Sequence, residues 1–219
     1  EPDSDKAETV VLSTEAGDIV VTPVYHGTAI VSFGEVVIWV DPWSKGSLEG
    51  RPRADVVLIT DIHSDHLDPA ALALVSKDGT KVVTPKVVAD ALERKVEHVL
   101  ANGEQVVLGE VTIQAIPMYN KVRGPEEGVV YHEKGRGNGY LLTMGGKRVY
   151  FAGDAFVPMN LPYTMPPSEA AECVKAFRPA VVVPYHYAGS DLAEFSAALE
   201  GVEGVTVRIV EFYEGGLPF

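Results

Sequence analysis

Short runs of apolar and β-branched residues, separated by glycines and polar clusters, dominate the first part of the chain. Three such runs, with a glycine between each pair, predict an antiparallel meander over residues 18–25, 28–33 and 35–40. The next run, ADVVLIT at 54–60, is apolar almost throughout, as expected for a strand buried on both faces. It ends abruptly in the polar sequence DIHSDHLD.

Helical and strand patterns alternate through the rest of the chain. Asp68 is suited to cap a helix that Pro69 opens. The predicted helices are 69–75, 85–95, 168–177 and 191–199, and the predicted strands are 81–84, 104–108, 110–118, 140–144, 147–154, 180–187 and 205–213. This order predicts an α/β fold in which two packed sheets are flanked by helices, formed as a single domain over residues 1–219.

The polar cluster after the buried strand carries the clearest chemical signal. Asp61, His63, Asp65 and His66 place four possible metal ligands within six residues. Alternate residues of an extended loop point the same way, so the first three can converge while His66 turns in from the start of the helix. Imidazole and carboxylate ligands together suit zinc, manganese or iron. A helix-capping cluster is the alternative, but a cap needs one aspartate and no histidine.

The run TDIHSDHLD resembles the HxHxDH signature of the metallo-β-lactamase superfamily, with Asp61 in place of the first histidine. Two further matches are Gly153-Asp154 at the end of a predicted strand and His186 in PYHY. The resemblance implies an αββα metallo-β-lactamase-like sandwich of two mixed sheets flanked by helices. It also implies a metal site formed by Asp61, His63, Asp65, His66, Asp154 and His186, in which Asp154 bridges two ions.

The sequence VYHGTAIVSF and the Val40-Asp41-Pro42 run also look like the branch of this superfamily that contains ascorbate-phosphate lactonase-like proteins. One departure concerns the position after the 110–118 strand, where the superfamily usually supplies another histidine and this sequence has Asn120. An amide oxygen is a poorer ligand than imidazole, and Asp61 is shorter than histidine and carries a charge. We therefore expect a weakened first site, and a complete second site formed by Asp65, His66, Asp154 and His186.

The segment 120–138 is rich in glycine, proline and charge, as functional loops often are. This segment contains His132, Lys134 and Arg136. These side chains either contact an anionic leaving group or form a solvated stretch. We assign catalytic roles to His132 and to Asp65, which could accept a proton from the attacking water. Asp41 either holds the second ring nitrogen of a ligand or caps a turn. His26 is expected mainly to pack or hydrogen-bond at a strand turn.

Charge and composition narrow the classes of partner. The chain has 18 basic and 31 acidic residues and a formal net charge of −13, which opposes binding to a phosphate backbone, so no nucleic-acid partner is expected. No apolar run approaches the length of a membrane span, which predicts a soluble chain with no membrane partner. One cysteine, Cys173, excludes an internal disulfide. The chain opens at Glu1, which leaves export and a cytoplasmic location both open, as is the oligomeric state.

These observations predict a metal-dependent hydrolase with one or two Zn²⁺ ions, or Mn²⁺ or Fe²⁺, acting on a small ester, lactone or phosphoester. The alternative is a non-catalytic metal-binding domain with a degenerate first site. The run FAGDAFVPMN joins what look like the ends of two different strands. This favours residues absent from the printed sequence between Asp154 and Ala155 over one continuous strand.

Overall fold

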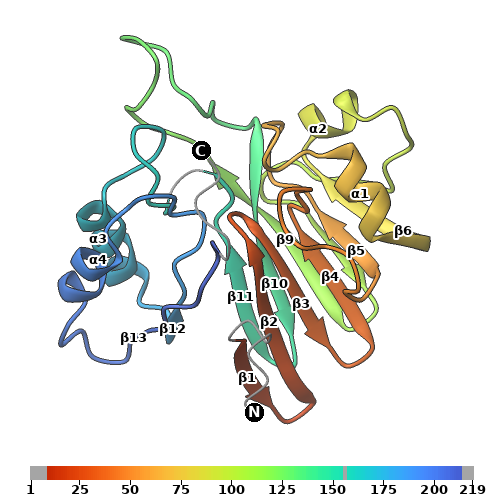
Figure 1. The fold of residues 1–219 in the computed structure, drawn as a ribbon, viewed down its shortest axis with the longest axis horizontal. Coiled ribbons are helices and arrows are strands. Elements are labelled where there is room, and N and C mark those ends of the chain that lie inside the picture. Colours follow the sequence, from red (N-terminus) through yellow and green to blue (C-terminus); the bar gives the residue numbers. More distant parts are fainter. Residues whose placement is uncertain (1–8, 155–156, 214–219) are drawn as a thin grey trace.

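Two β-sheets lie between two pairs of helices in the computed structural model, which describes residues 9–154 and 157–213. The helices α1 (Pro69–Val75) and α2 (Lys86–Ala91) lie on one flank, and α3 (Pro167–Phe177) and α4 (Leu192–Ala198) lie together on the other (Figure 1). Asp68 caps α1, because its Oδ1 accepts the backbone N–H groups of Ala70 and Ala71. The predicted α/β sandwich is confirmed.

The larger sheet has seven strands in chain order, β1 (Val10–Thr14), β2 (Gly17–Tyr25), β3 (Thr28–Phe33), β4 (Val36–Val40), β5 (Ala54–Leu58), β6 (Ser76–Thr84) and β7 (His98–Val99). Strands β2 to β4 form the predicted antiparallel meander, which the unpredicted β1 extends by one antiparallel strand, and β4 to β7 run parallel. The sheet is therefore mixed. Strand β5 lies inside it and is largely buried, as its apolar sequence predicts.

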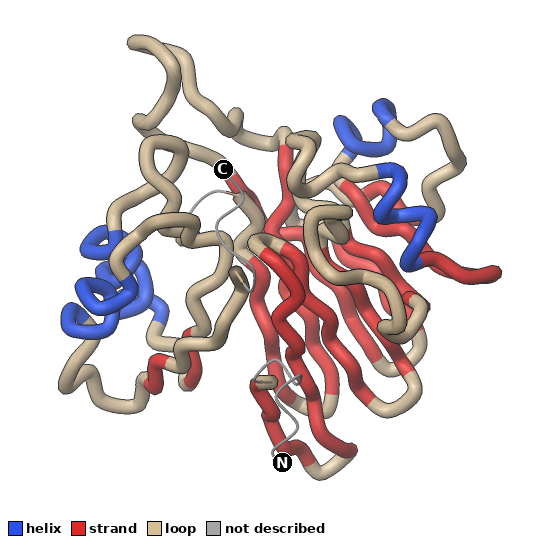
Figure 2. Tube along the Cα trace, in the orientation of Figure 1, coloured by secondary structure: helices blue, strands red, loops and turns tan. Residues whose placement is uncertain are grey.

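The smaller sheet has the order β11-β10-β9-β8 and is antiparallel throughout; its strands are β8 (Gln105–Leu108), β9 (Val111–Met118), β10 (Gly137–Met144) and β11 (Lys147–Phe151). Two short parallel strands, β12 (Val181–Val182) and β13 (Thr206–Val207), pair separately. The expectation of two mixed sheets is therefore wrong in this detail. The tube view shows the long loop between β9 and β10 reaching away from the sheets (Figure 2).

Three of the predicted elements are shortened most in the structure. The predicted strand 180–187 shrinks to β12, because Pro184 has no N–H and His186 and Ala188 have positive φ values of 54° and 44°, which a strand does not allow. The predicted strand 205–213 shrinks to β13 beside it. The predicted helix 85–95 ends at Ala91, because the backbone of Leu92 is extended, with φ of −80° and ψ of 126°.

Several strands begin or end at one edge of the sandwich. Strands β2 and β4 both pair antiparallel with β3, so His26 and Asp41, which follow them, emerge together. Strand β5 runs parallel to β4 and delivers Thr60 and Asp61 beside Asp41. In the other sheet, Met118 pairs with Gly137, so the end of β9 and the start of β10 meet. The end of β11 lies at this same edge.

Apolar side chains from both sheets form the core, and a buried tyrosine adds a polar contact between them. Trp39 and Ile38 of β4, with Ile113 of β9 and Leu142 of β10, are almost fully buried. Tyr140 of β10 is also fully buried, and its Oη donates a hydrogen bond of 2.9 Å to the carbonyl of Ile59 at the end of β5. This bond ties the smaller sheet to the strand that precedes the polar cluster.

Helices α1 to α4 are all too short or too polar to cross a membrane. The predicted break between Asp154 and Ala155 falls on Ala155 and Phe156, which lie outside the described residues.

Replacing Tyr140 with Phe should lower the free energy of unfolding by about 1–3 kcal/mol, because the buried carbonyl of Ile59 loses its partner. Tyr150 offers a matched control: its buried hydroxyl has no hydrogen-bond partner within 9–154 and 157–213. Tyr150→Phe should therefore leave the unfolding free energy unchanged or raise it. Urea denaturation of both variants measures the difference, and equal losses would refute the role given to Tyr140.

Candidate metal centre

Five of the six histidines of the chain gather at the shared edge of the sandwich, among several aspartates. Side chains able to ligate a metal form three overlapping groups, in each of which one atom per residue lies within 4.8 Å of all the others: Asp61, His63, His132 and Asp154; His66, Asp154 and His186; and His26, Asp65 and His186. His98, in β7, is the remaining histidine. The six residues that the sequence analysis put forward as metal ligands all lie in these groups.

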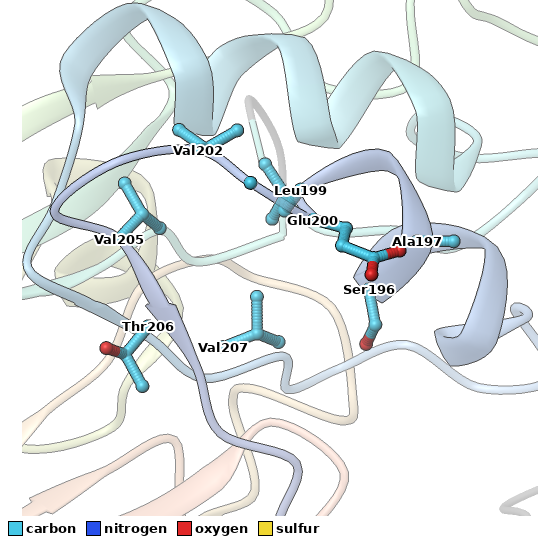
Figure 3. Close-up of a pocket in the computed structure, with 9 residues that line it drawn as sticks. Ser196, Ala197, Leu199, Glu200, Val202, Val205, Thr206 and Val207 are labelled. Atoms are coloured by element: carbon cyan, nitrogen blue, oxygen red, sulfur yellow. The ribbon is translucent and has the colours of Figure 1, made fainter.

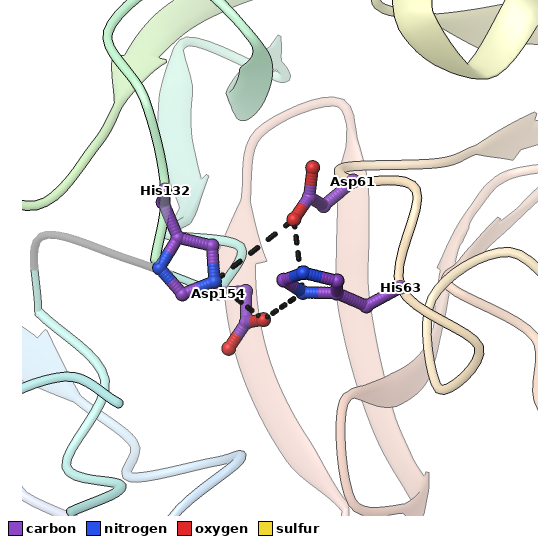
Figure 4. Close-up of side chains that lie close together, drawn as sticks. All are labelled: Asp61, His63, His132 and Asp154. Atoms are coloured by element: carbon purple, nitrogen blue, oxygen red, sulfur yellow. Dashed lines mark hydrogen bonds and ion pairs between the residues drawn. The ribbon is translucent and has the colours of Figure 1, made fainter. Parts of the chain in front are cut away.

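The first group contains Asp61, His63, His132 and Asp154, whose side chains point toward one another (Figure 4). Oδ2 of Asp154 lies 2.9 Å from Nδ1 of His63 and 2.8 Å from Nε2 of His132. Oδ2 of Asp61 lies 3.1 Å from Nδ1 of His63 and 3.9 Å from Nε2 of His132. Three of these residues are buried, and His63 is partly exposed. Two carboxylates and two imidazoles thus converge on one point.

The second group is His66, Asp154 and His186, and from here on we include Asp65 of the third group in it, because its carboxylate lies beside both histidines. The two Nε2 atoms of His66 and His186 are 3.1 Å apart. Oδ2 of Asp154 lies 3.5 Å from Nε2 of His66, and Oδ1 of Asp154 lies 3.5 Å from Nε2 of His186. Oδ2 of Asp65 lies 3.3 Å from His186 and 3.6 Å from His66. Asp154 therefore faces both groups at once.

The spacing of these atoms fits metal coordination. Two ligands at roughly 2.0–2.1 Å from a zinc ion, at a tetrahedral angle, are about 3.3–3.4 Å apart. The separations in the two groups range from 2.8 Å to 3.9 Å. Nitrogen and carboxylate donors are also the types that zinc and related ions take. The residues present therefore suit one or two metal ions, with Asp154 between the two positions.

Asp41 fixes the orientation of His66. Its Oδ2 accepts a hydrogen bond of 2.7 Å from Nδ1 of His66, while the hydroxyl and backbone N–H of Thr60 donate to the same carboxylate at 2.6 Å and 2.8 Å. With Nδ1 engaged in this way, Nε2 of His66 faces the second group. Of the two roles considered for Asp41, the structure supports orientation of a ligand's second ring nitrogen.

His132 takes the position that the sequence analysis gave to Asn120. Its Nε2 lies in the first group, whereas Oδ1 of Asn120 accepts the backbone N–H of His132 at 3.0 Å and a hydrogen bond from its Nδ1. The backbone N–H of Asn120 donates to the carbonyl of His132 at 2.9 Å, which closes the loop. The expectation that Asn120 replaces a histidine ligand is therefore wrong. Of the two reasons for a weakened first site, the one based on Asn120 does not hold, and Asp61 in place of a histidine remains.

His132, Lys134 and Arg136 of the long loop have different environments in the structure. His132 is buried inside the first group and does not lie on a solvated stretch. Nη2 of Arg136 lies 2.7 Å from Oδ2 of Asp61, so Arg136 also reaches the group. Nζ of Lys134 lies 5.6 Å from the centre of the Tyr119 ring, outside the groups. Of the two basic side chains, Arg136 is the one that contacts the site.

His26 is the site residue that the sequence analysis undervalued. It is fully buried, and its Nε2 lies 3.1 Å from Oδ2 of Asp65. Its Nδ1 lies 2.7 Å from Oη of Tyr213, which accepts the backbone N–H of Ala188 at 2.6 Å and so directs its own proton to His26. Nε2 of His26 then carries the proton that Asp65 accepts. Burial lowers the pKa of His26 to about 4, so its ring is neutral.

The backbone around the site is held in unusual conformations. His26, Asp41 and His186 have positive φ values of 52°, 43° and 54°. Such residues persist where the surrounding structure fixes them, often at functional sites. Gly153, directly before Asp154, has φ of 71°, and a Cβ there would lie 2.4 Å from Sδ of Met118. Glycine at this position lets Asp154 enter the site between the two sheets.

The buried charges of the site shift the pKa values of His66 and Asp154 in opposite directions. Burial alone would lower the pKa of His66, but Asp41 and Asp65 outweigh it and raise the pKa well above its usual value. Burial alone would raise the pKa of Asp154, but His186 and His66 hold it well below its usual range. Because metal ligands must be deprotonated, metal binding here releases protons and weakens as the pH falls.

A separate surface hollow of about 480 Å³ lies between α4 and β13 (Figure 3). Its lining includes Leu199, Val202, Val205 and Val207, and none of its residues belongs to the three ligand groups. The hollow is therefore separate from the ligand groups.

Residues 20–162 match the family model described as the beta-lactamase superfamily domain. The chain belongs to this superfamily. The relationship predicted from the 61–66 signature is confirmed. A relative in the superfamily, a UPF0173 metal-dependent hydrolase from Thermococcus kodakarensis, is 28% identical over 181 residues, which are 70% of this chain and 78% of that protein.

Solved structures agree with this membership. A protein from Parabacteroides distasonis, described as a candidate metal-dependent hydrolase, is 34% identical with a TM-score of 0.85, and the match covers 94% of this chain and 99% of that one. Igni18, a metallo hydrolase from Ignicoccus hospitalis, is 24% identical with a TM-score of 0.70 and 90% and 96% coverage, and supports the fold alone.

Replacing Asn120 with Ala should lower the metal affinity of the protein about 10- to 100-fold, the usual cost of removing a group that orients a ligand. Asn120→Asp keeps an oxygen acceptor for Nδ1 of His132 and should retain most of that affinity. Titration of the metal-free protein with zinc against a chromophoric chelator measures both variants. Equal losses of zinc affinity in the two variants would show that the side-chain oxygen of residue 120, which faces Nδ1 of His132, does not determine the affinity.

Proposed function

We propose that this chain is a metal-dependent hydrolase that directs water against a small ester, lactone or phosphoester. The observation that carries the proposal is the carboxylate of Asp154, whose two oxygens lie within 3.5 Å of histidine nitrogens from both ligand groups. Names of relatives in the superfamily support the same reaction class. The ester, lactone or phosphoester class itself rests on the chemistry of such a centre and on the predicted lactonase-like branch.

The ligand sets follow from the two groups. We assign Asp61, His63, His132 and Asp154 to the first ion, and Asp65, His66, Asp154 and His186 to the second. Nitrogen and carboxylate donors favour zinc, with manganese or iron as alternatives. His132 supplies a second imidazole to the first group, which favours a complete first site over the alternative of a degenerate one.

A metal ion bound there would lower the pKa of a coordinated water toward neutrality and polarise the carbonyl or phosphoryl oxygen of the substrate. Asp65 is the partly exposed carboxylate of the second group, with 23% of its side chain accessible. His26 holds its Oδ2, so Asp65 is oriented to accept a proton from the attacking water. Burial opposes ionisation of Asp65, but His66 and His186 outweigh it and hold its pKa well below the usual range. We therefore rank ligation above base catalysis for Asp65.

The test is turnover of model substrates by the protein loaded separately with zinc, manganese and iron. Lactone, aryl ester and phosphodiester probes cover the proposed class. We expect metal-dependent hydrolysis that a chelator removes and added metal restores. His132→Ala should lower the rate by at least about 100-fold, since even groups behind the ligands contribute 10- to 100-fold.

His98→Ala is the matched control, because this histidine of β7 lies outside the three ligand groups. It should retain the native rate. A protein that binds metal firmly but hydrolyses none of the probes with any of the three metals would contradict the proposal and favour a non-catalytic metal-binding domain.

A further inference from the structure

Arg136 binds a carboxylate of the first ligand group through two hydrogen bonds. Its Nη2 lies 2.7 Å from Oδ2 of Asp61, and its Nε lies 3.2 Å from Oδ1. Asp61 is fully buried, and 22% of the Arg136 side chain is exposed. Oδ2 is also the oxygen that lies 3.1 Å from Nδ1 of His63. The guanidinium therefore holds the same atom that faces the ligand group.

The backbone around Arg136 fixes this contact. The N–H of Asn138 donates to the carbonyl of Thr60 at 2.9 Å, which joins the start of β10 to the residue before Asp61. A Cβ at Gly137 would lie 3.0 Å from that carbonyl, tighter than most real contacts. The start of β10 thus lies directly against the segment that carries Asp61. The ion pair is therefore fixed by the fold of the site and is not a chance contact of a long surface side chain.

The Arg136–Asp61 ion pair offsets part of the negative charge of the first group. The first group holds two carboxylates, Asp61 and Asp154, and a buried carboxylate without a partner is costly. The planar guanidinium matches a carboxylate with two parallel donors, which an ammonium group cannot do. Arg136 therefore both orients Asp61 and reduces the negative charge of the first group by one.

We propose that Arg136 is a positioning residue of the metal centre, and that Asp61 and Arg136 act together as one nearly neutral ligand. This inference rests on the proposed function, because it requires a metal ion in the first group. The effect of each residue on the metal ion then depends on whether the other is present. Removing Arg136 leaves Asp61 without its orienting partner. Replacing Asp61 with a neutral imidazole leaves the guanidinium uncompensated beside the metal ion, which it then repels.

A double-mutant cycle tests this coupling. The four proteins are the native chain, Arg136→Gln, Asp61→His and the double variant, and the readout is the affinity of the first group for cobalt(II), followed by its visible absorption. Arg136→Gln should weaken binding about 10- to 100-fold in the native background. In the Asp61→His background the same substitution should strengthen it. Effects that differ by less than about tenfold between the two backgrounds would overturn the inference.

Controls separate this outcome from a general structural effect. Arg123 forms a comparable two-bond pair with Glu169, at 2.9 Å and 2.7 Å, outside the ligand groups. Arg123→Gln should leave cobalt affinity unchanged, and a loss equal to that of Arg136→Gln would overturn the proposal. If Arg136→Gln fails to fold by circular dichroism, Arg136→Lys takes its place, since it keeps the charge and loses the planar fork. Its expected loss is about tenfold, and native affinity would refute the inference.

The cycle also distinguishes this inference from the proposed function. A native chain that binds no cobalt would overturn both. Firm binding by the native chain, with equal effects of Arg136→Gln in both backgrounds, would overturn the role of Arg136 alone.

Discussion

A buried carboxylate is stable only where positive charge or hydrogen-bond donors surround it, and Asp154 meets this constraint by facing four histidines. Its Oδ2 lies 2.8 Å and 2.9 Å from His132 and His63, and its two oxygens lie 3.5 Å from His66 and His186. Moving this carboxylate would separate the two ligand groups. The arrangement of the site therefore depends on where β11 ends and on the glycine that precedes Asp154.

The fold satisfies the constraint through strand direction. Parallel strands β4 and β5 end side by side, so Asp41 reaches His66 and Thr60 across one strand spacing. The antiparallel smaller sheet adds the loop that carries His132 and Arg136. Tyr140 links this sheet to the end of β5. This bond holds the ligands from the two sheets in place relative to one another. The core thus positions ligands that lie far apart in the chain.

The cluster at 61–66 could be predicted because its ligands are neighbours in the sequence and directly follow a buried strand. The place of His132 beside Asp61, His63 and Asp154 could not be predicted, because it depends on a loop that closes through Asn120, and the pattern shows only where the loop begins. His26 stood alone in the sequence, and its contact with Asp65 is made across the fold. The strand at 180–187 was overextended because an apolar pattern does not reveal the positive φ of His186.

The proposed chemistry depends on a centre in which Asp154 stands between two metal ions. Anomalous diffraction from crystals of the metal-loaded protein, recorded at the zinc, manganese and iron absorption edges, tests this most directly. We expect two peaks about 3.5–4 Å apart, each within ligand distance of an Asp154 oxygen. A single peak bound only by the second group, or peaks that do not contact Asp154, would contradict it.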